Sequence, residues 1–216
     1  MPPRPSRNVD QLLIQAGHEL LPQTGVRGLS IRQVTERAGV NLGMFHYHFK
    51  TKDVFVRAIL EQKYNDMFRG LETKSRGSDS ALINLRAAVT LLARWGRDNR
   101  VFWVRLLGDA FAGEKVALEF MRANMPRHIE VVIDLVLRAQ KEGELRKMPI
   151  QQALAFLMGA LAAPIVVGTA AINSGFVPEF VREQLEQLVF TDAAIEERVE
   201  MALLGMAAVR KTGRRK

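Results

Sequence analysis

The residues of this chain best suited to chemistry gather in one aromatic and basic run, Gly43-Met44-Phe45-His46-Tyr47-His48-Phe49-Lys50. On a helix, Phe45 and Phe49 lie four residues apart on one face, which we expect to be buried. At about 100° per residue, Gly43 and Tyr47 then point outward, flanked by Met44, His46 and Lys50. Tyrosine and histidine can donate to phosphate, lysine pairs with it, and methionine can contact a thymine methyl group. The outward face therefore suits duplex DNA.

Other interpretations of this run stay open from the residues alone. His46 and His48 are candidate zinc ligands, but a spacing of two places them on different sides of a helix, and no third ligand is suitably spaced. Tyr47 is alternatively a half-buried packing residue, and Met44 a core residue. Two short helices also occur in helical hairpins that bind no DNA.

Lys52 follows the run and falls in the first turn of the next expected helix. An ammonium group at that position opposes the helix dipole, so we expect no local stabilising role. An anionic partner is the better explanation for a lysine there.

Local signals define the two short helices that hold these residues. Ser30 and Gln33 have the spacing of a capping box at the start of the first helix. Gly39 can adopt the left-handed conformation that ends it. Asn41 is a good N-cap for the second helix, which we expect to run to about His48. A glycine in a three-residue turn between short helices is typical of a helix-turn-helix, whose second helix enters the DNA major groove.

Residues 9–55 resemble the N-terminal module of the TetR family of bacterial transcriptional repressors. The resemblance lies in the motifs Gly28-Leu29-Ser30-Ile31-Arg32-Gln33-Val34, Ala38-Gly39-Val40 and Gly43-Met44-Phe45-His46-Tyr47-His48-Phe49-Lys50-Thr51-Lys52-Asp53. The sequence departs from the family pattern at three positions. His46 stands where tyrosine is usual, Met44 where a small threonine or alanine is common, and Asn41 where serine is common. These three differences bear on which operator sequence the protein would bind, and they leave the resemblance to the family intact.

The resemblance implies a role for each matching residue. Arg32 would contact a base or phosphate from the first short helix, and Ser30 a phosphate. Base edges would be faced by Leu42, Gly43 and Met44, and the DNA backbone would be held by His46, Tyr47, His48, Lys50 and Lys52. With Asn41 these residues form the predicted DNA-contacting set. An N-terminal arm with Arg4 and Arg7 would reach an adjacent groove.

Charge and composition agree with a nucleic-acid partner. The 216 residues carry a net charge of +8, and 48% of them are hydrophobic. Residues 1–52 hold seven Lys or Arg against three Asp or Glu, residues 205–216 hold five against none, and the middle is nearly neutral. A basic module on a neutral body favours a polyanion. The sequence has no cysteine, which excludes disulfides and thiolate sites, and no secretory signal is expected, so we predict a cytoplasmic protein.

The remaining chain predicts an all-α fold. Val9, Leu12, Leu13, Ala16 and Leu20 form one apolar stripe on a first helix that we expect to end at residues 22–25. Further helices are expected over residues 51–73, 81–97, 98–112, 114–124, 126–142, 149–172 and 192–211, and a possible one over 179–188. We assign residues 1–52 to an N-terminal arm and three-helix helix-turn-helix DNA-binding domain, 53–211 to a C-terminal helical effector-binding and dimerisation domain, and 212–216 to a basic tail.

Two features of the body concern its association. Residues 148–178 carry no charge, which fits a membrane-spanning helix or a helix buried on two sides. The last helix has an apolar seam made of Ile195, Val199, Ala202 and Met206. That seam serves either intrachain packing or a second subunit. The resemblance favours a homodimer built from the last two helices, with two recognition helices about 34 Å apart on a near-palindromic operator.

Several aromatic and methionine side chains lie on the middle helices. The resemblance implies an apolar effector cavity there, for which the candidates are Trp103, Phe111, Phe120, Met121 and Phe156. No enzyme motif is present, so we expect no catalysis, cofactor or metal. The sequence thus predicts a ligand-responsive repressor that binds an operator as a dimer, is released by a small hydrophobic effector, and has no membrane partner. The alternative is a helical membrane-surface or scaffold protein without DNA binding.

Overall fold

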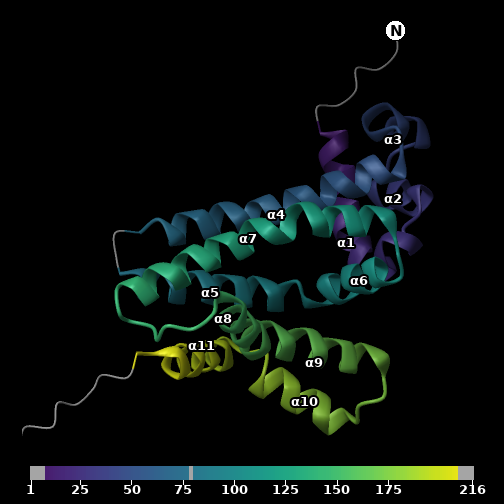
Figure 1. The fold of residues 1–216 in the computed structure, drawn as a ribbon. Coiled ribbons are helices and arrows are strands. Elements are labelled where there is room, and N and C mark those ends of the chain that lie inside the picture. The colour runs from purple at the N-terminus through teal and green to yellow at the C-terminus, as the bar shows by residue number, and fades with distance from the viewer. Residues whose placement is uncertain (1–7, 78–79, 209–216) are drawn as a thin grey trace, which may run out of the picture. The chain divides into compact units, whose positions relative to one another are not determined.

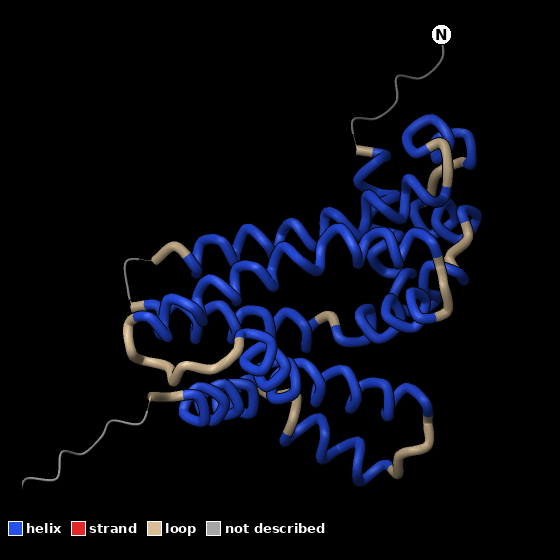
Figure 2. Tube along the Cα trace, viewed as in Figure 1, coloured by secondary structure: helices blue, strands red, loops and turns tan. Residues whose placement is uncertain are grey.

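A computed structural model describes residues 8–77 and 80–208 of the chain (Figure 1). Within these residues the secondary structure is helical, and Figure 2 shows helices joined by short loops. The elements are α1 (Val9–Gly28), α2 (Ile31–Ala38), α3 (Leu42–Phe49), α4 (Lys52–Ser75), α5 (Ala81–Asp98), α6 (Arg100–Phe111), α7 (Lys115–Lys141), α8 (Ile150–Leu157), the π-helix η1 (Met158–Ala162), α9 (Ala163–Ser174), α10 (Glu179–Leu188) and α11 (Asp192–Met206). The all-α prediction is confirmed.

The chain forms two compact units. Unit 1 comprises the residues up to Asp66 together with Val101–Met125, and unit 2 comprises Met67–Arg100 together with the residues from Pro126 onward. Both α4 and α7 are therefore divided between the units. The functional boundary that we predict after residue 52 stays a prediction, and Arg4, Arg7 and the tail 212–216 lie outside the described residues.

In unit 1, α1 follows the predicted stripe with one exception. Leu13, Ala16 and Leu20 are buried, whereas Leu12 is 44% exposed, so its assignment to the stripe is wrong. Val9 is buried as well, and the 4-3-4 spacing of these four buried residues completes one face, whose centre lies about 70° away from Leu12. The helix also continues past Pro22 to Gly28, with a break at Gly25 inside it.

The prediction of two helices around Pro126 is also wrong, because α7 is continuous across that residue. A proline in a helix interior removes one backbone hydrogen bond but does not have to end the helix. The boundary between the two compact units nevertheless falls directly before Pro126.

In unit 2, the uncharged segment forms α8, η1 and α9 instead of one regular helix. The π-helical turn ends at Ala162. The N–H of the next residue, Ala163, donates to the Met158 carbonyl five residues earlier, and Pro164 follows without an N–H of its own. Ile150–Ser174 is the segment of the described chain that is long and apolar enough to cross a membrane. Its mean hydropathy is 2.1, and only 28% of the most apolar stretch is buried.

The last helix, α11, ends at Met206, earlier than predicted. An isolated antiparallel bridge joins Leu145 to Ala207, and the Arg146 N–H donates to the Met206 carbonyl at 2.9 Å. The backbone after Met206 is thus paired as extended chain, which stops the helix.

The predicted seam of α11 lies inside the single chain. Ile195, Val199, Ala202 and Met206 are each at most 2% exposed, and α11 lies against α5 and η1. Ion pairs of Arg86 with Glu200 and of Arg94 with Glu196 tie α5 to α11. The assignment of these four residues to a dimer interface is therefore corrected, since side chains already covered by their own chain present no free surface.

Candidate nucleic-acid interface

The first short helix, α2, begins and ends as the sequence predicts. Ser30 Oγ accepts from the Gln33 N–H at 3.2 Å, and the Gln33 side chain accepts from the Ser30 N–H at 3.3 Å. Gly39 adopts the left-handed conformation (φ 68°, ψ 29°), and its N–H reaches the carbonyls of the last turn. These caps bond backbone groups at both ends of α2 that have no partner within the helix, which has only eight residues. Local hydrogen bonds therefore fix the turn between α2 and α3.

The second short helix, α3, has the two faces predicted for it. Asn41 Oδ1 accepts from the Met44 N–H at 3.0 Å and starts the helix. Phe45 is fully buried and Phe49 is 9% exposed, and both rings meet Phe55 edge-on at centroid distances of 5.1 and 4.9 Å. Tyr47, on the opposite face, is 69% exposed. The outward position of Tyr47 excludes the packing role left open by the sequence.

The predicted DNA-contacting residues divide by burial into two groups. The exposed ones are Ser30, Arg32, Asn41, Leu42, Gly43, His46, Tyr47 and Lys50. The half-buried ones are Met44, His48 and Lys52. All of them belong to unit 1, in α2, α3, the adjoining turns and the first residue of α4, and α1, α2 and α3 contact one another there. The described residues contain no cluster of three or more metal-ligating side chains.

Arg32 is the most exposed base of α2, and it has an acidic neighbour. Its Nε donates to Glu36 Oε1 at 2.8 Å, and the two side chains are 88% and 62% exposed. The hydrogen bond that Arg32 donates to Glu36 raises the pKa of Arg32, so the guanidinium stays charged. Glu36 is a residue of this site that was not predicted from the sequence, although its spacing of four residues from Arg32 on a helix is typical of an ion pair.

We expect the Glu36→Gln variant to bind duplex DNA about three- to tenfold more tightly at low salt, because it removes a carboxylate that competes with phosphate for Arg32. Fluorescence anisotropy at several salt concentrations measures the affinity and its salt dependence. Glu72→Gln is the matched control, since Glu72 pairs with Arg76 at the same spacing and at 3.0 Å on α4. An equal gain in both variants would contradict a role for Glu36 at the interface.

Lys52 has a local partner that the sequence did not predict. Its Nζ donates to the Arg27 carbonyl, in the last turn of α1, at 3.1 Å. A cation at the C-terminal end of a helix stabilises the unpaired carbonyls there. The expectation that Lys52 has no local role is therefore wrong. The ammonium group has two further N–H donors for a phosphate.

His46 also has a backbone partner, in the C-cap residue of α3. Its Nδ1 lies 3.1 Å from the Lys50 carbonyl oxygen. A carbonyl only accepts, so Nδ1 carries the proton and Nε2 is an acceptor in the neutral ring.

The candidate effector residues are divided between the two units. In unit 1, Phe120 is 5% exposed and Trp103 and Met121 are half-buried, whereas Phe111 is 87% exposed. Phe156 belongs to unit 2 and is 46% exposed. Phe111 and Phe156 lie at the surface of the chain, so neither encloses a cavity in this structure. For the other three the cavity stays a prediction.

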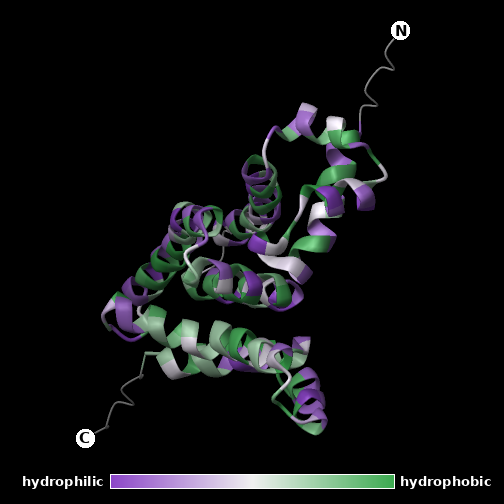
Figure 3. Ribbon diagram, turned by 90° about the vertical axis from the view of Figure 1, so that its right-hand side faces the viewer, coloured by the Kyte–Doolittle hydropathy of each residue, from purple (hydrophilic) through white to green (hydrophobic). Residues whose placement is uncertain are grey.

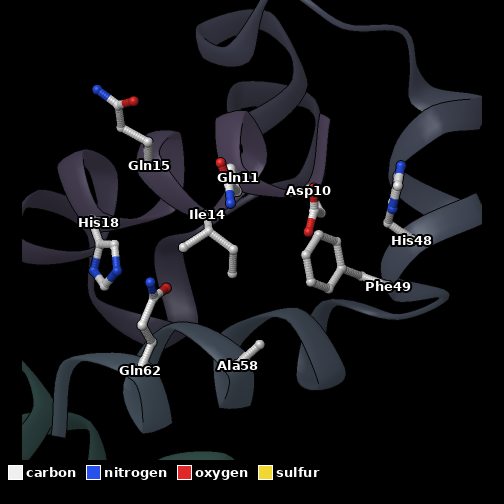
Figure 4. A pocket seen from close by; sticks show the side chains of 9 residues that line it. All are labelled: Asp10, Gln11, Ile14, Gln15, His18, His48, Phe49, Ala58 and Gln62. Carbon is white, nitrogen blue, oxygen red and sulfur yellow. The ribbon is translucent and has the colours of Figure 1, made fainter. Parts of the chain in front are cut away.

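Unit 1 has a groove that the sequence did not predict (Figure 4). It has a volume of about 730 Å³ and is lined by residues from α1, α3 and α4, namely Asp10, Gln11, Ile14, Gln15, His18, His48, Phe49, Ala58 and Gln62. Burial, and secondarily the positive charge of Lys63, lower the pKa of His18 in this groove.

Because the folded chain lowers the pKa of His18, the unfolded chain binds its proton more tightly. The free energy of unfolding should thus fall as the pH drops below the ordinary histidine value of about 6.5, and the effect should stop below the folded-state pKa. We expect His18→Gln to lose part of this dependence in urea titrations between pH 7.5 and 5. An identical pH profile in the variant would rule out this contribution.

Residues 13–59 match the model of the bacterial regulatory proteins of the tetR family. This segment belongs to the tetR family. The match covers most of α1, all of α2 and α3, and the start of α4, and it includes every residue of the predicted DNA-contacting set. TetR-family proteins are transcription regulators, in agreement with the prediction that the chain is not an enzyme.

Solved structures resemble the whole chain. A Clostridium perfringens protein whose name assigns it to the regulation of fatty acid metabolism has 14% identity and a TM-score of 0.71, over 92% of this chain and 100% of that one. The TetR-family regulator PfmR from Thermus thermophilus has 17% identity and a TM-score of 0.64, over 98% and 100%. A TetR-family regulator from Marinobacter aquaeolei has 17% identity and a TM-score of 0.61, over 93% and 96%. At such identities the likeness shows the fold, with its N-terminal helix-turn-helix and helical C-terminal part. No curated protein matches the sequence.

Proposed function

We propose that this TetR-family regulator is a cytoplasmic repressor that binds a palindromic operator as a homodimer and is released by a small hydrophobic effector. The observation that carries the DNA-binding part is the two-faced helix α3. Phe45 and Phe49 anchor one face in the core, and the other face presents Tyr47 and His46 to the outside. The Tyr47 side chain is 69% exposed, so its hydroxyl is free to donate to a DNA phosphate.

The dimer surface of this proposal lies on α8, η1, α9 and α11. In Figure 3, apolar colour dominates the lower helices, where α8, α9 and α11 lie. Large apolar side chains on these elements are exposed in the single chain, namely Phe156, Met158, Val167, Met201 and Leu204. Extensive exposed apolar surface is typical of an association site. A two-fold dimer would present two copies of α3 to the two halves of a palindrome.

The effector part of the proposal rests on Trp103, Phe120 and Met121 in unit 1. An aromatic and methionine lining favours an apolar ligand that varies in shape. A ligand that prefers one conformation of the chain would shift the population of the DNA-binding form.

The alternative function is a membrane-surface or scaffold protein, which the apolar and largely uncovered segment Ile150–Ser174 favours. The two functions predict different partners. A repressor should bind a short palindromic duplex in a salt-dependent manner and ignore lipid vesicles, whereas a membrane-surface protein should do the opposite.

The experiment that tests the proposal is the selection of duplexes from a random pool, followed by anisotropy titration of the selected sequence. We expect Tyr47→Ala to weaken binding by roughly 30-fold, from about 1 kcal/mol lost in each half-site. Phe176→Ala, which removes a ring that is 76% exposed in unit 2, is the control and should bind normally. Equal affinities of wild type and Tyr47→Ala would refute the assigned DNA face.

A further inference from the structure

The break in α1 has a geometry that a regular helix does not allow. Gly25 is buried and has φ 67° and ψ −178°, in the region that favours glycine, while helix continues on both sides of it. Only residues 26–29 separate this break from Ser30, the N-cap of α2. The direction in which the chain leaves Gly25 therefore decides where α2 and α3 begin.

A carboxylate from α6 sits directly on this break. Asp109 Oδ2 accepts a hydrogen bond from the Val26 N–H at 2.6 Å, across 83 positions of the sequence. In an unbroken helix that N–H would point to the Pro22 carbonyl. A Cβ atom at Gly25 would lie 2.6 Å from the same Oδ2, closer than a Cβ atom approaches another heavy atom in folded proteins. The left-handed glycine and the carboxylate thus fit each other.

The short segment after the break is held from two further directions. Val26 and Leu29 are 2% and 3% exposed, so their side chains are anchored in the core of unit 1. Lys52 binds the Arg27 carbonyl from the start of α4. Both hydrogen bonds involve a charged group, but the Lys52 bond comes from α4, next to the helix-turn-helix, whereas the Asp109 bond comes from α6. Hydrogen bonds to a charged group are short and strong.

We infer that Asp109 is a positioning residue for DNA binding. Its carboxylate fixes the last turn of α1 against α6, and thereby sets the placement of α2 and α3 relative to α6 within unit 1. A displacement of α6 would be passed to the helix-turn-helix through the Val26 amide. This inference rests on the proposed function.

The test uses the full-length chain, the selected operator and a series of palindromes with central spacers of different lengths. Asp109→Ala removes the acceptor, and Asp109→Asn keeps an uncharged carbonyl that can still accept. Asp134→Ala is the control, because Asp134 is an exposed carboxylate on α7 that pairs with Arg138. Hydrogen exchange at the Val26 amide reports the loss of the bond in each variant.

In Asp109→Ala we expect the Val26 amide hydrogen to exchange faster than in the wild type. The affinity for the palindrome with the best spacer should fall about tenfold, which is the loss that accompanies one mismatched base pair. Palindromes with other spacer lengths should be tolerated better than by the wild type. Asp109→Asn should lie between the wild type and Asp109→Ala in exchange rate, affinity and spacer preference. A merely structural carboxylate would change the melting temperature but leave the spacer preference intact, and that result would overturn the inference.

Two controls keep the outcomes separate. If Asp109→Ala does not fold, Asp109→Asn decides, and a wild-type spacer preference together with fast Val26 exchange in that variant would contradict the inference. If the wild type itself selects no duplex, the proposed function fails. If the wild type binds the selected duplex and the Asp109 variants show the same affinity and the same spacer preference as the wild type, this inference fails and the proposed function stands.

Discussion

Phe45→Ala is expected to unfold the DNA-binding module, with a loss of about 3–5 kcal/mol of stability. The Phe45 ring is fully buried, and its centroid lies 5.1 Å from that of Phe55 and 5.8 Å from that of Phe49. Alanine would leave a cavity under a helix of only eight residues, whose caps cannot replace the lost contacts. Operator binding should disappear with the fold of α3.

Amide hydrogen exchange in α2 and α3 measures this effect separately from the stability of unit 2. Tyr47→Ala is the matched comparison, because it removes an aromatic ring from the same helix two residues away. We expect slow exchange with weak DNA binding in Tyr47→Ala, and fast exchange in Phe45→Ala. Slow exchange in both variants would disprove the anchoring role of Phe45.

Leu204→Glu is expected to dissociate the dimer and to weaken operator binding by about 100-fold or more, because each head must then bind its half-site alone. Leu204 is 64% exposed on α11, so a charge there is solvated in the monomer and buried only in the proposed interface. Sedimentation velocity measures the association and anisotropy measures the affinity.

Leu137→Glu is the control for this prediction, because Leu137 is 49% exposed on α7, outside the proposed surface. Met206→Glu would not test the dimer, since Met206 is fully buried in its own chain and the charge would unfold unit 2. A Leu204→Glu variant that sediments as a dimer would place the interface elsewhere.

The features predicted correctly from the sequence are set by short-range geometry. The capping box of Ser30 and Gln33, the N-cap of Asn41 and the two faces of α3 each depend on residues at most four positions apart. The same holds for the left-handed Gly39. The helix-turn-helix is therefore predictable, because its structure is mostly local.

The features that the sequence did not predict depend on distant partners. The break at Gly25 is matched by Asp109, and the early end of α11 by the pairing of Leu145 with Ala207. The seam from Ile195 to Met206 has the same spacing whether it faces α5 or a second subunit, so periodicity could not choose between them. The Lys52 bond to Arg27 likewise joins residues 25 positions apart.

The most direct test of the DNA-contacting face uses the absence of cysteine from the chain. A DNA-cleaving iron chelate is attached to His46→Cys on α3 and, as a control, to Gln187→Cys on α10, and each conjugate is mixed with the selected duplex. The His46→Cys conjugate should cut within both half-sites, with centres about 34 Å apart, while the Gln187→Cys conjugate should not. Duplex that is bound but left uncut by the His46→Cys conjugate would contradict the proposed mode of DNA binding.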